Sequence, residues 1–212
     1  MGNASTSRPD LAQRWDDAYE RRGTTGVSWF QPETTMSIDL FNHLGIAHDA
    51  AIIDVGGGAS LLVDFLIDQG FSDVSVVDVS KAALYATRER IGAGAPVTFL
   101  NEDLLTWRPA RRFDVWHDRA VFHFLVEPSD RDVYLHLLRS ALHPSGALIM
   151  ATFAPNGPEY CSGLPVARYS ADELTSLLGD RFEIVEVRDE QHSTPGGAIQ
   201  PFTWISARAS AS

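Results

Sequence analysis

Two aspartates follow short apolar runs at a spacing that suits a nucleoside ligand. Asp78 lies 24 residues after Asp54, and Asp103 follows the next apolar run along the chain. In open α/β sheets ligands bind at the carboxyl ends of parallel strands, where a carboxylate at this distance can accept hydrogen bonds from ribose hydroxyls. A second carboxylate can receive the exocyclic amine of adenine. Either acid alone would be a loop-capping or solvated side chain, but the two together favour a nucleoside ligand.

A glycine-rich turn stands where the first of these runs should give way to a helix. Residues 52–60 read Ile-Ile-Asp-Val-Gly-Gly-Gly-Ala-Ser, with Gly56, Gly57 and Gly58 in succession. Glycine permits positive φ and lets a ligand approach the backbone, although a tight strand-to-helix connection alone needs similar residues. The dinucleotide pattern G-x-G-x-x-G fails because Leu61 takes its last position. The turn therefore argues against a nicotinamide or flavin enzyme.

Alternating strands and helices would position these residues. Apolar runs predict parallel strands at residues 51–55, 74–77, 97–100, 113–116 and 147–153. Periodic segments predict helices at residues 61–69, 80–91 and 129–142, and a shorter helix that opens on a capping box of Ser170 and Glu173. Two final strand-like runs, 182–187 and 202–206, have no helix between them and should pair antiparallel. We predict a three-layer, Rossmann-like α/β fold whose sheet is mostly parallel with an antiparallel final strand.

The residues before the first strand are expected to form an N-terminal helical cap. Helical spacing in residues 11–22 and 36–44 predicts two helices there. We divide the chain into a tail and cap, residues 1–50, and a core, residues 51–212. A chain of 212 residues suits a single domain overall.

From residue 51 to its end, the chain resembles the class I S-adenosylmethionine (SAM)-dependent methyltransferase family. Asp54 with its glycines looks like the SAM loop of that family, Asp78 like its ribose acid and Asp103 like its adenine acid. The final antiparallel pair is similar to its last hairpin, and Ser60 replaces a third glycine that many members have. The resemblance implies SAM as cofactor, bound by Asp54, Gly56, Gly57, Gly58, Asp78, Val79, Asp103, Leu104 and Asp118.

The segment after the fourth strand supplies candidates for acceptor chemistry. In the family it borders the sulfonium and the acceptor, which makes His117, Asp118 and His123 the candidate catalytic residues. His123 could act as a base because imidazole titrates near neutral pH. The competing interpretations are a hydrogen-bonded core residue for His123, an ion pair between Asp118 and Arg119, and a core position for His117. A base is needed only if the acceptor arrives protonated.

Aromatic residues before the core could close a substrate pocket. The candidates are Trp15, Tyr19, Trp29 and Phe30, and the pair at 29 and 30 is favoured as a lid because it lies in a loop with less core to fill. Packing of one helix explains Trp15 and Tyr19 equally well. Cys161 lies in the turn-rich segment after the fifth strand and is expected to be a packing residue, not a nucleophile.

Composition narrows the function to a few classes. The formal net charge of −11 opposes binding to nucleic acid, and no apolar run is long enough for a membrane span. We predict a cytoplasmic methyltransferase with a small-molecule substrate and no metal site. A protein lysine methyltransferase, attracted to a basic segment by the acidic charge, and a non-catalytic SAM-binding module remain open. A nicotinamide oxidoreductase is disfavoured by the failed fingerprint.

Overall fold

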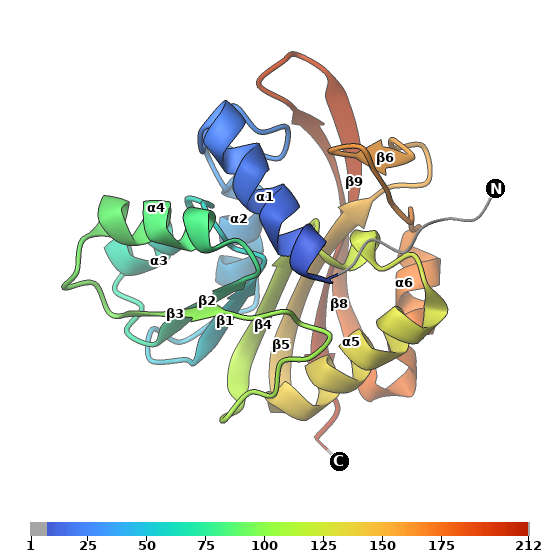
Figure 1. Ribbon diagram of the computed structural model, residues 1–212. Helices are drawn as coiled ribbons and strands as arrows, with labels where there is room; N and C mark the ends of the chain where they lie inside the picture. The colour runs from blue at the N-terminus through green and yellow to red at the C-terminus, as the bar shows by residue number, and fades with distance from the viewer. Residues whose placement is uncertain (1–7, 212) are drawn as a thin grey trace.

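One seven-stranded sheet organises the protein. The computed structural model describes residues 8–211 and gives the strand order β3-β2-β1-β4-β5-β9-β8 (Figure 1). The strands are β1 Ile52–Val55, β2 Val74–Asp78, β3 Val97–Asn101, β4 Phe113–Arg119, β5 Leu142–Phe153, β8 Phe182–Ser193 and β9 Ile199–Ala209. Strands β1 to β5 pair in parallel, whereas β9 runs antiparallel between β5 and β8. The predicted fold class, including the antiparallel ending, is confirmed.

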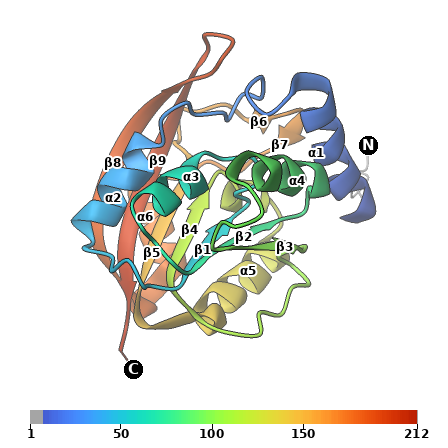
Figure 2. The same ribbon diagram turned by 90° about the vertical axis from the view of Figure 1, so that its left-hand side faces the viewer.

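Helices cover both faces of this sheet and make the three layers (Figures 1 and 2). One face carries α2 Thr35–His43, α3 Leu62–Asp68 and α4 Lys81–Ile91, and the other carries α5 Pro128–Ala141 and α6 Ala171–Leu178. The predicted capping box of α6 is present, since the Ser170 side chain accepts from the Glu173 N–H and Glu173 reaches back to the Ser170 N–H. None of the described helices is long and apolar enough to cross a membrane.

The two N-terminal helices differ in what they cover. Leu40 and Phe41 of α2 are each 1% exposed and pack with Ile52 and Val115 in the core on one face of the sheet. Helix α2 is therefore packed into one layer of the core. Only α1, Arg8–Arg22, lies across the carboxyl-end edge of the parallel strands, beside α4 (Figure 1).

Helix α1 is tied to the start of α4 by one carboxylate. Asp16 Oδ1 accepts hydrogen bonds from Ser80 Oγ at 2.6 Å and from the Ala82 N–H at 3.0 Å. Ser80 also caps α4 by accepting from the Ala83 N–H at 3.1 Å. These bonds fix the middle of α1 at the start of α4, close to the carboxyl end of β2.

Segments expected to be irregular contain some regular pairing. Residues 154–169 include a small hairpin of β6 Tyr160–Cys161 and β7 Leu164–Pro165. Strands β8 and β9 run well beyond their predicted bounds and form a long hairpin that projects from the sheet (Figure 1). Both hairpins rise on the side of the sheet where α1 lies (Figures 1 and 2).

Candidate functional site

The turn between β1 and α3 is held in a form that requires glycine. Gly56 and Gly58 have φ of 64° and 35°, values that favour residues without Cβ. A Cβ on Gly56 would overlap the Val121 side chain, and one on Gly57 would overlap the Asp54 carboxylate. One on Gly58 would stand 2.6 Å from Asp78 Oδ2. The turn therefore lies in close contact with the carboxylates of Asp54 and Asp78.

Two adjoining cavities open beside this turn. The Asp78 cavity, about 150 Å³, is lined by Asp78, Val79, Asp103 and Leu104 and by apolar residues that include Trp15 and Phe124. The smaller glycine-loop cavity, about 50 Å³, is lined by Asp54, Gly56, Gly57, Ser60 and Phe30 among others. Four residues line both cavities: Tyr19, Trp29, Gly56 and Arg119. We call their meeting point the junction.

Asp78 and Asp103, which line the Asp78 cavity, each accept a hydrogen bond from a backbone N–H two residues further along the chain. Asp78 Oδ1 accepts from the Ser80 N–H at 2.7 Å, and Asp103 Oδ1 accepts from the Leu105 N–H at 2.9 Å. Burial, only partly opposed by the Ser80 hydrogen bond, raises the pKa of Asp78 to about 7. A carboxylate can accept several hydrogen bonds, as recognition of a nucleoside requires.

A buried polar chain supports the glycine-loop cavity. Asp54 Oδ1 lies 2.7 Å from His117 Nδ1, and His117 Nε2 lies 3.0 Å from Ser37 Oγ. Asp54 Oδ2 is buried and has no hydrogen-bond partner among the described residues. An unsatisfied buried carboxylate oxygen is costly, so this atom suits a ligand group that donates hydrogen bonds.

Known proteins share this chain's sequence pattern and its fold. A family model described as a methyltransferase domain matches residues 52–146. The EEF1A lysine methyltransferase 2 of Danio rerio is 30% identical over 84% of this chain and 78% of its own length. The chain belongs to the class I SAM-dependent methyltransferases.

Other relatives of this methyltransferase carry different names. The thiocyanate methyltransferase 1 of Arabidopsis thaliana is 26% identical over 85% of this chain and 78% of its own length. A crystal structure of the Burkholderia thailandensis 1,6-didemethyltoxoflavin-N1-methyltransferase with S-adenosylhomocysteine (SAH) superposes with a TM-score of 0.71, at 20% identity, over 99% of this chain and 92% of that one. The cofactor of the methyltransferase is SAM.

The residues present fit that cofactor. A nucleoside would meet Asp78 and Asp103 in one cavity, and the amino-acid part would meet the glycine turn and the unsatisfied Asp54 Oδ2 in the other. When bound, SAM supplies an electrophilic methyl carbon, which takes a lone pair of the acceptor as its bond to sulfur breaks and leaves SAH. The protein's task is to hold both reactants close in a site shielded from water.

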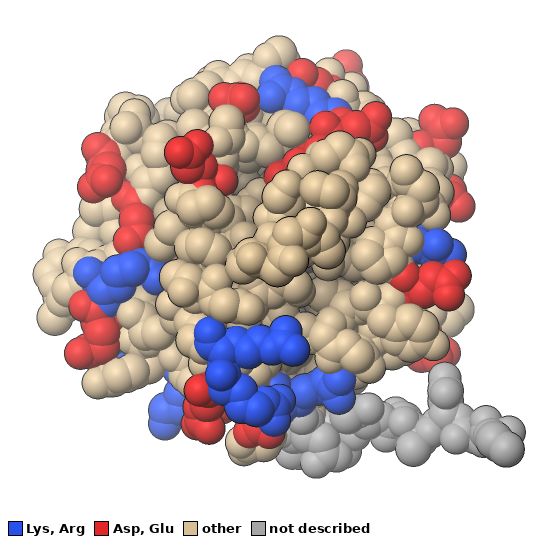
Figure 3. Space-filling model, turned by 90° about the horizontal axis from the view of Figure 1, so that it is seen from above, with Lys and Arg blue, Asp and Glu red and all other residues tan. Residues whose placement is uncertain are grey.

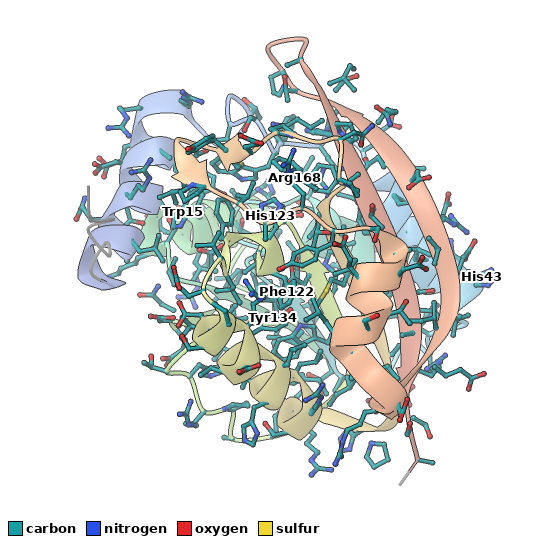
Figure 4. All side chains as sticks on the ribbon, turned by 90° about the vertical axis from the view of Figure 1, so that its right-hand side faces the viewer. Trp15, His43, Phe122, His123, Tyr134 and Arg168 are labelled. Atoms are coloured by element: carbon teal, nitrogen blue, oxygen red, sulfur yellow. The ribbon has the colours of Figure 1, made fainter. Side chains whose placement is uncertain are left out.

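The three predicted catalytic residues do not line either cavity. His117 lies behind Asp54, as described above, and Asp118 is fully buried, accepting from Tyr134 Oη and from the Val121 N–H at 3.0 Å. His123 is also fully buried, and its Nδ1 accepts from the Phe153 N–H at 3.3 Å. Figure 4 shows His123 inside the molecule near Phe122, with Tyr134 below. The geometry favours a structural role for all three.

The surroundings of His123 also make it a poor base. Burial and the nearby charge of Arg119 lower the pKa of His123 to about 3. A general base works best with a pKa near the operating pH, so a neutral imidazole of this kind accepts a proton weakly. Asp118, whose pKa burial raises to about 6, has its oxygens engaged by Tyr134 and the backbone.

All four predicted aromatic residues lie in cavity walls, and three of them interlock. The Trp29 ring centroid is 5.3 Å from that of Trp15 and 5.8 Å from that of Tyr19, both edge-to-face. Trp29 Nε1 donates to Tyr19 Oη at 3.1 Å. We call Trp15, Tyr19 and Trp29 the aromatic lid. Figure 3, which looks down on this side of the molecule, shows a largely uncharged centre with charged residues towards the rim.

Some wall residues were not predicted. Glu102 and Leu105 flank the predicted pair Asp103 and Leu104, so their neighbourhood in sequence could have indicated them. Cys161 reaches the Asp78 cavity from β6, and Arg119 lines both cavities from the last position of β4. Nothing in the sequence marks Arg119 as a cavity residue, because its position depends on how far β4 extends.

Cofactor affinity should depend on pH through Asp78. Ribose hydroxyls are bound best by the ionised carboxylate, and with a pKa of about 7 only about one carboxyl in ten is ionised at pH 6. We expect the dissociation constant of SAH to rise about tenfold between pH 8 and pH 6. Isothermal titration calorimetry across this range measures the effect, and Asp78→Asn should abolish it.

The direction in which Asp78 changes the folding stability distinguishes weaker SAH binding at pH 6 from unfolding by acid. The folded pKa of Asp78 lies above the ordinary value of 3.8, so protonation of this group as the pH falls through 7 stabilises the ligand-free fold. Weaker SAH binding at pH 6 should therefore occur without any Asp78-dependent loss of thermal stability. An affinity that stays constant from pH 8 to pH 6 would contradict ribose recognition by this carboxylate.

Proposed function

We propose that the methyltransferase acts on a small-molecule acceptor enclosed beneath the aromatic lid. The observation that carries this proposal is the position of the lid over the junction, where Trp29 and Tyr19 line both cavities. A lid of this kind encloses a small substrate and excludes water, whereas a protein side chain needs an open channel from the surface.

The proposal assigns each cavity a part of SAM. Asp78 accepts hydrogen bonds from the ribose, Asp103 receives the adenine amine, and Val79 and Leu104 pack against the base. Asp54 and the glycine turn hold the amino-acid part, so that the methyl group lies at the junction. The supporting observation is that these residues line adjoining cavities and that Asp54 Oδ2 lacks a partner among the described residues.

Protein lysine methylation is the second candidate. The Danio rerio relative is named for a lysine of EEF1A, and the formal net charge of −11 would attract a basic segment. The names of the Arabidopsis and Burkholderia proteins, in contrast, specify thiocyanate and a didemethyltoxoflavin as acceptors. A cytoplasmic location belongs to the proposal as well, supported by the free thiol of buried Cys161.

The two candidates are separated by following the methyl group. The protein is incubated with methyl-tritiated SAM and an extract that contains both metabolites and proteins, which are then divided by acid precipitation. We expect label in the acid-soluble fraction, eluting apart from SAM, and far less of it with Asp78→Ala. Label confined to precipitated protein would overturn the small-molecule proposal and establish the second candidate.

Removing an aromatic ring from the lid should lower the rate of methyl transfer much more than it lowers the thermal stability of the protein. Trp29→Ala removes a ring that lines both cavities, so we expect turnover to fall at least about tenfold as the acceptor loses its position and water enters. Trp29 is only partly buried, and its loss should change thermal stability little. Trp29→Phe, which keeps a ring but loses the hydrogen bond to Tyr19, should retain most of the turnover. Full activity of Trp29→Ala would remove the lid from the mechanism.

A further inference from the structure

Arg119 is a buried cation whose hydrogen-bonding capacity is largely unused. Its side chain is 10% exposed, and Nη1 donates to the Trp29 carbonyl at 3.0 Å. Nε and Nη2 have no hydrogen-bond partner among the described residues. A desolvated guanidinium with two unmet donor nitrogens is costly unless a ligand completes it. Since Arg119 lines both cavities, that ligand would lie at the junction.

The surroundings balance only part of this charge. Glu190 Oε2 stands 4.0 Å from Arg119 Nη2, beyond hydrogen-bond distance. Both Glu190 oxygens are already engaged, Oε1 by Gln31 Nε2 and Oε2 by Trp204 Nε1, each at 2.8 Å. The Phe202 ring lies under the guanidinium with its centroid 4.6 Å from Cζ. Burial lowers the pKa of Arg119 to about 10, which still leaves it charged near neutral pH.

The four residues that line both cavities, Tyr19, Trp29, Gly56 and Arg119, include no histidine or carboxylate that could remove a proton, and the proposal assigns the carboxylates of Asp54, Asp78 and Asp103 to SAM. No histidine is among the residues lining the two cavities in the described part of the chain. Burial raises the pKa of Tyr19 and takes that of Cys161 to about 11, so both remain protonated at neutral pH. An acceptor that enters already ionised needs no base, and a nearby guanidinium favours the ionised form.

We propose that the acceptor is a small organic anion, a carboxylate or a thiolate, whose charged group pairs with Arg119 at the junction. This inference rests on the proposed small-molecule function and specifies its substrate class. An anion placed there also separates two cations, the guanidinium and the sulfonium, which would otherwise repel one another in an apolar site. A lysine ammonium would be disfavoured at the same position.

Matched anionic and neutral probes test the pairing. The SAH-loaded protein is titrated at pH 8 with benzoate against benzamide, and with thiophenol, which is ionised at this pH, against phenol, which is neutral. We expect the anion of at least one pair to bind about tenfold more tightly than its neutral partner. Arg119→Gln should reduce that ratio to near one, and the pair that responds distinguishes carboxylate from thiolate. Equal binding within both pairs, or a ratio unchanged by Arg119→Gln, would overturn the inference.

A second variant, Glu190→Gln, should strengthen anion binding instead of weakening it, and its test is valid even if Arg119→Gln does not fold. Glu190→Gln removes the partial counter-charge and should tighten binding of the anion several-fold without tightening binding of its neutral partner. If Arg119 only supports the fold, Glu190→Gln would leave the anion preference as it is. That result would also overturn the inference.

The carboxylate of SAM is the other anion that could pair with Arg119. Two analogues of SAM, one with this carboxylate and one without it, distinguish the two possibilities. SAH carries that carboxylate, whereas 5′-methylthioadenosine keeps the nucleoside and lacks it. We expect Arg119→Gln to leave the affinity for both nearly unchanged. Loss of SAH affinity alone would assign Arg119 to the cofactor and refute the acceptor pairing, while the labelled-methyl experiment would still decide the proposed function independently.

Discussion

Replacing Asp78 with alanine is expected to weaken SAH binding about 100-fold. The carboxylate is the proposed acceptor for two ribose hydroxyls, and losing hydrogen bonds to a charged group costs about 3 kcal/mol, which corresponds to this factor. Asp78→Asn keeps one acceptor oxygen and should lose about tenfold. Calorimetric titration with SAH measures both variants.

The control for Asp78 lies at the other end of the same strand. Asp73 precedes β2 and forms an ion pair with Arg111 at 2.7 Å, far along the strand from the Asp78 cavity. Asp73→Ala should bind SAH as the wild type does. Equal affinities of Asp78→Ala and Asp73→Ala would mean that the cofactor does not contact Asp78.

Replacing Asp118 with alanine is expected to cost about 3 kcal/mol of unfolding free energy, because it leaves buried donors without partners. The donors are Tyr134 Oη, the Val121 N–H and, at 3.4 Å, the Phe122 N–H. Tyr134 Oη also receives Trp116 Nε1 at 2.9 Å, so the loss should spread into the core between β4 and α5. Urea titration followed by tryptophan fluorescence measures the change.

Asp118→Asn separates structure from chemistry at this position. Asparagine keeps a carbonyl oxygen for the Val121 N–H, so the destabilisation should be less than half that of alanine. Because Asp118 does not line either cavity, turnover per folded molecule should stay close to that of the wild type. A folded Asp118→Asn variant without activity would restore the catalytic role that its sequence position suggests.

The residues predicted for the cofactor side lie together in the structure because their sequence signals are local. Glycines at a strand end and acids after the next two strands are placed together by the parallel sheet itself, whatever the details of packing. Asp54, Asp78 and Asp103 accordingly lie in the walls of adjoining cavities. Trp15 and Tyr19 share those walls because α1 is fixed to the start of α4 through Asp16, and Trp29 joins them by packing against both rings.

The acceptor side was harder to predict because it depends on tertiary pairing. The run His117-Asp118-Arg119 looks too polar for a strand, yet β4 continues through it between β1 and β5. His117 and Asp118 are consequently buried and contact residues that are themselves buried. Arg119, at the end of the strand, is the one of the three that reaches the junction. The position of His123 likewise follows from packing against Phe153, which no local pattern indicates.

Hydrogen–deuterium exchange with and without SAH tests most directly whether the cofactor occupies the two adjoining cavities. We predict slower exchange at residues 56–60, 78–80 and 103–105, which lie in or beside the cavity walls, and in α1 as the lid settles. Residues 182–193 of the projecting hairpin should exchange at the same rate in both states. Protection that is absent from the glycine turn and the two acidic segments, or that appears only elsewhere, would contradict the proposed cofactor site.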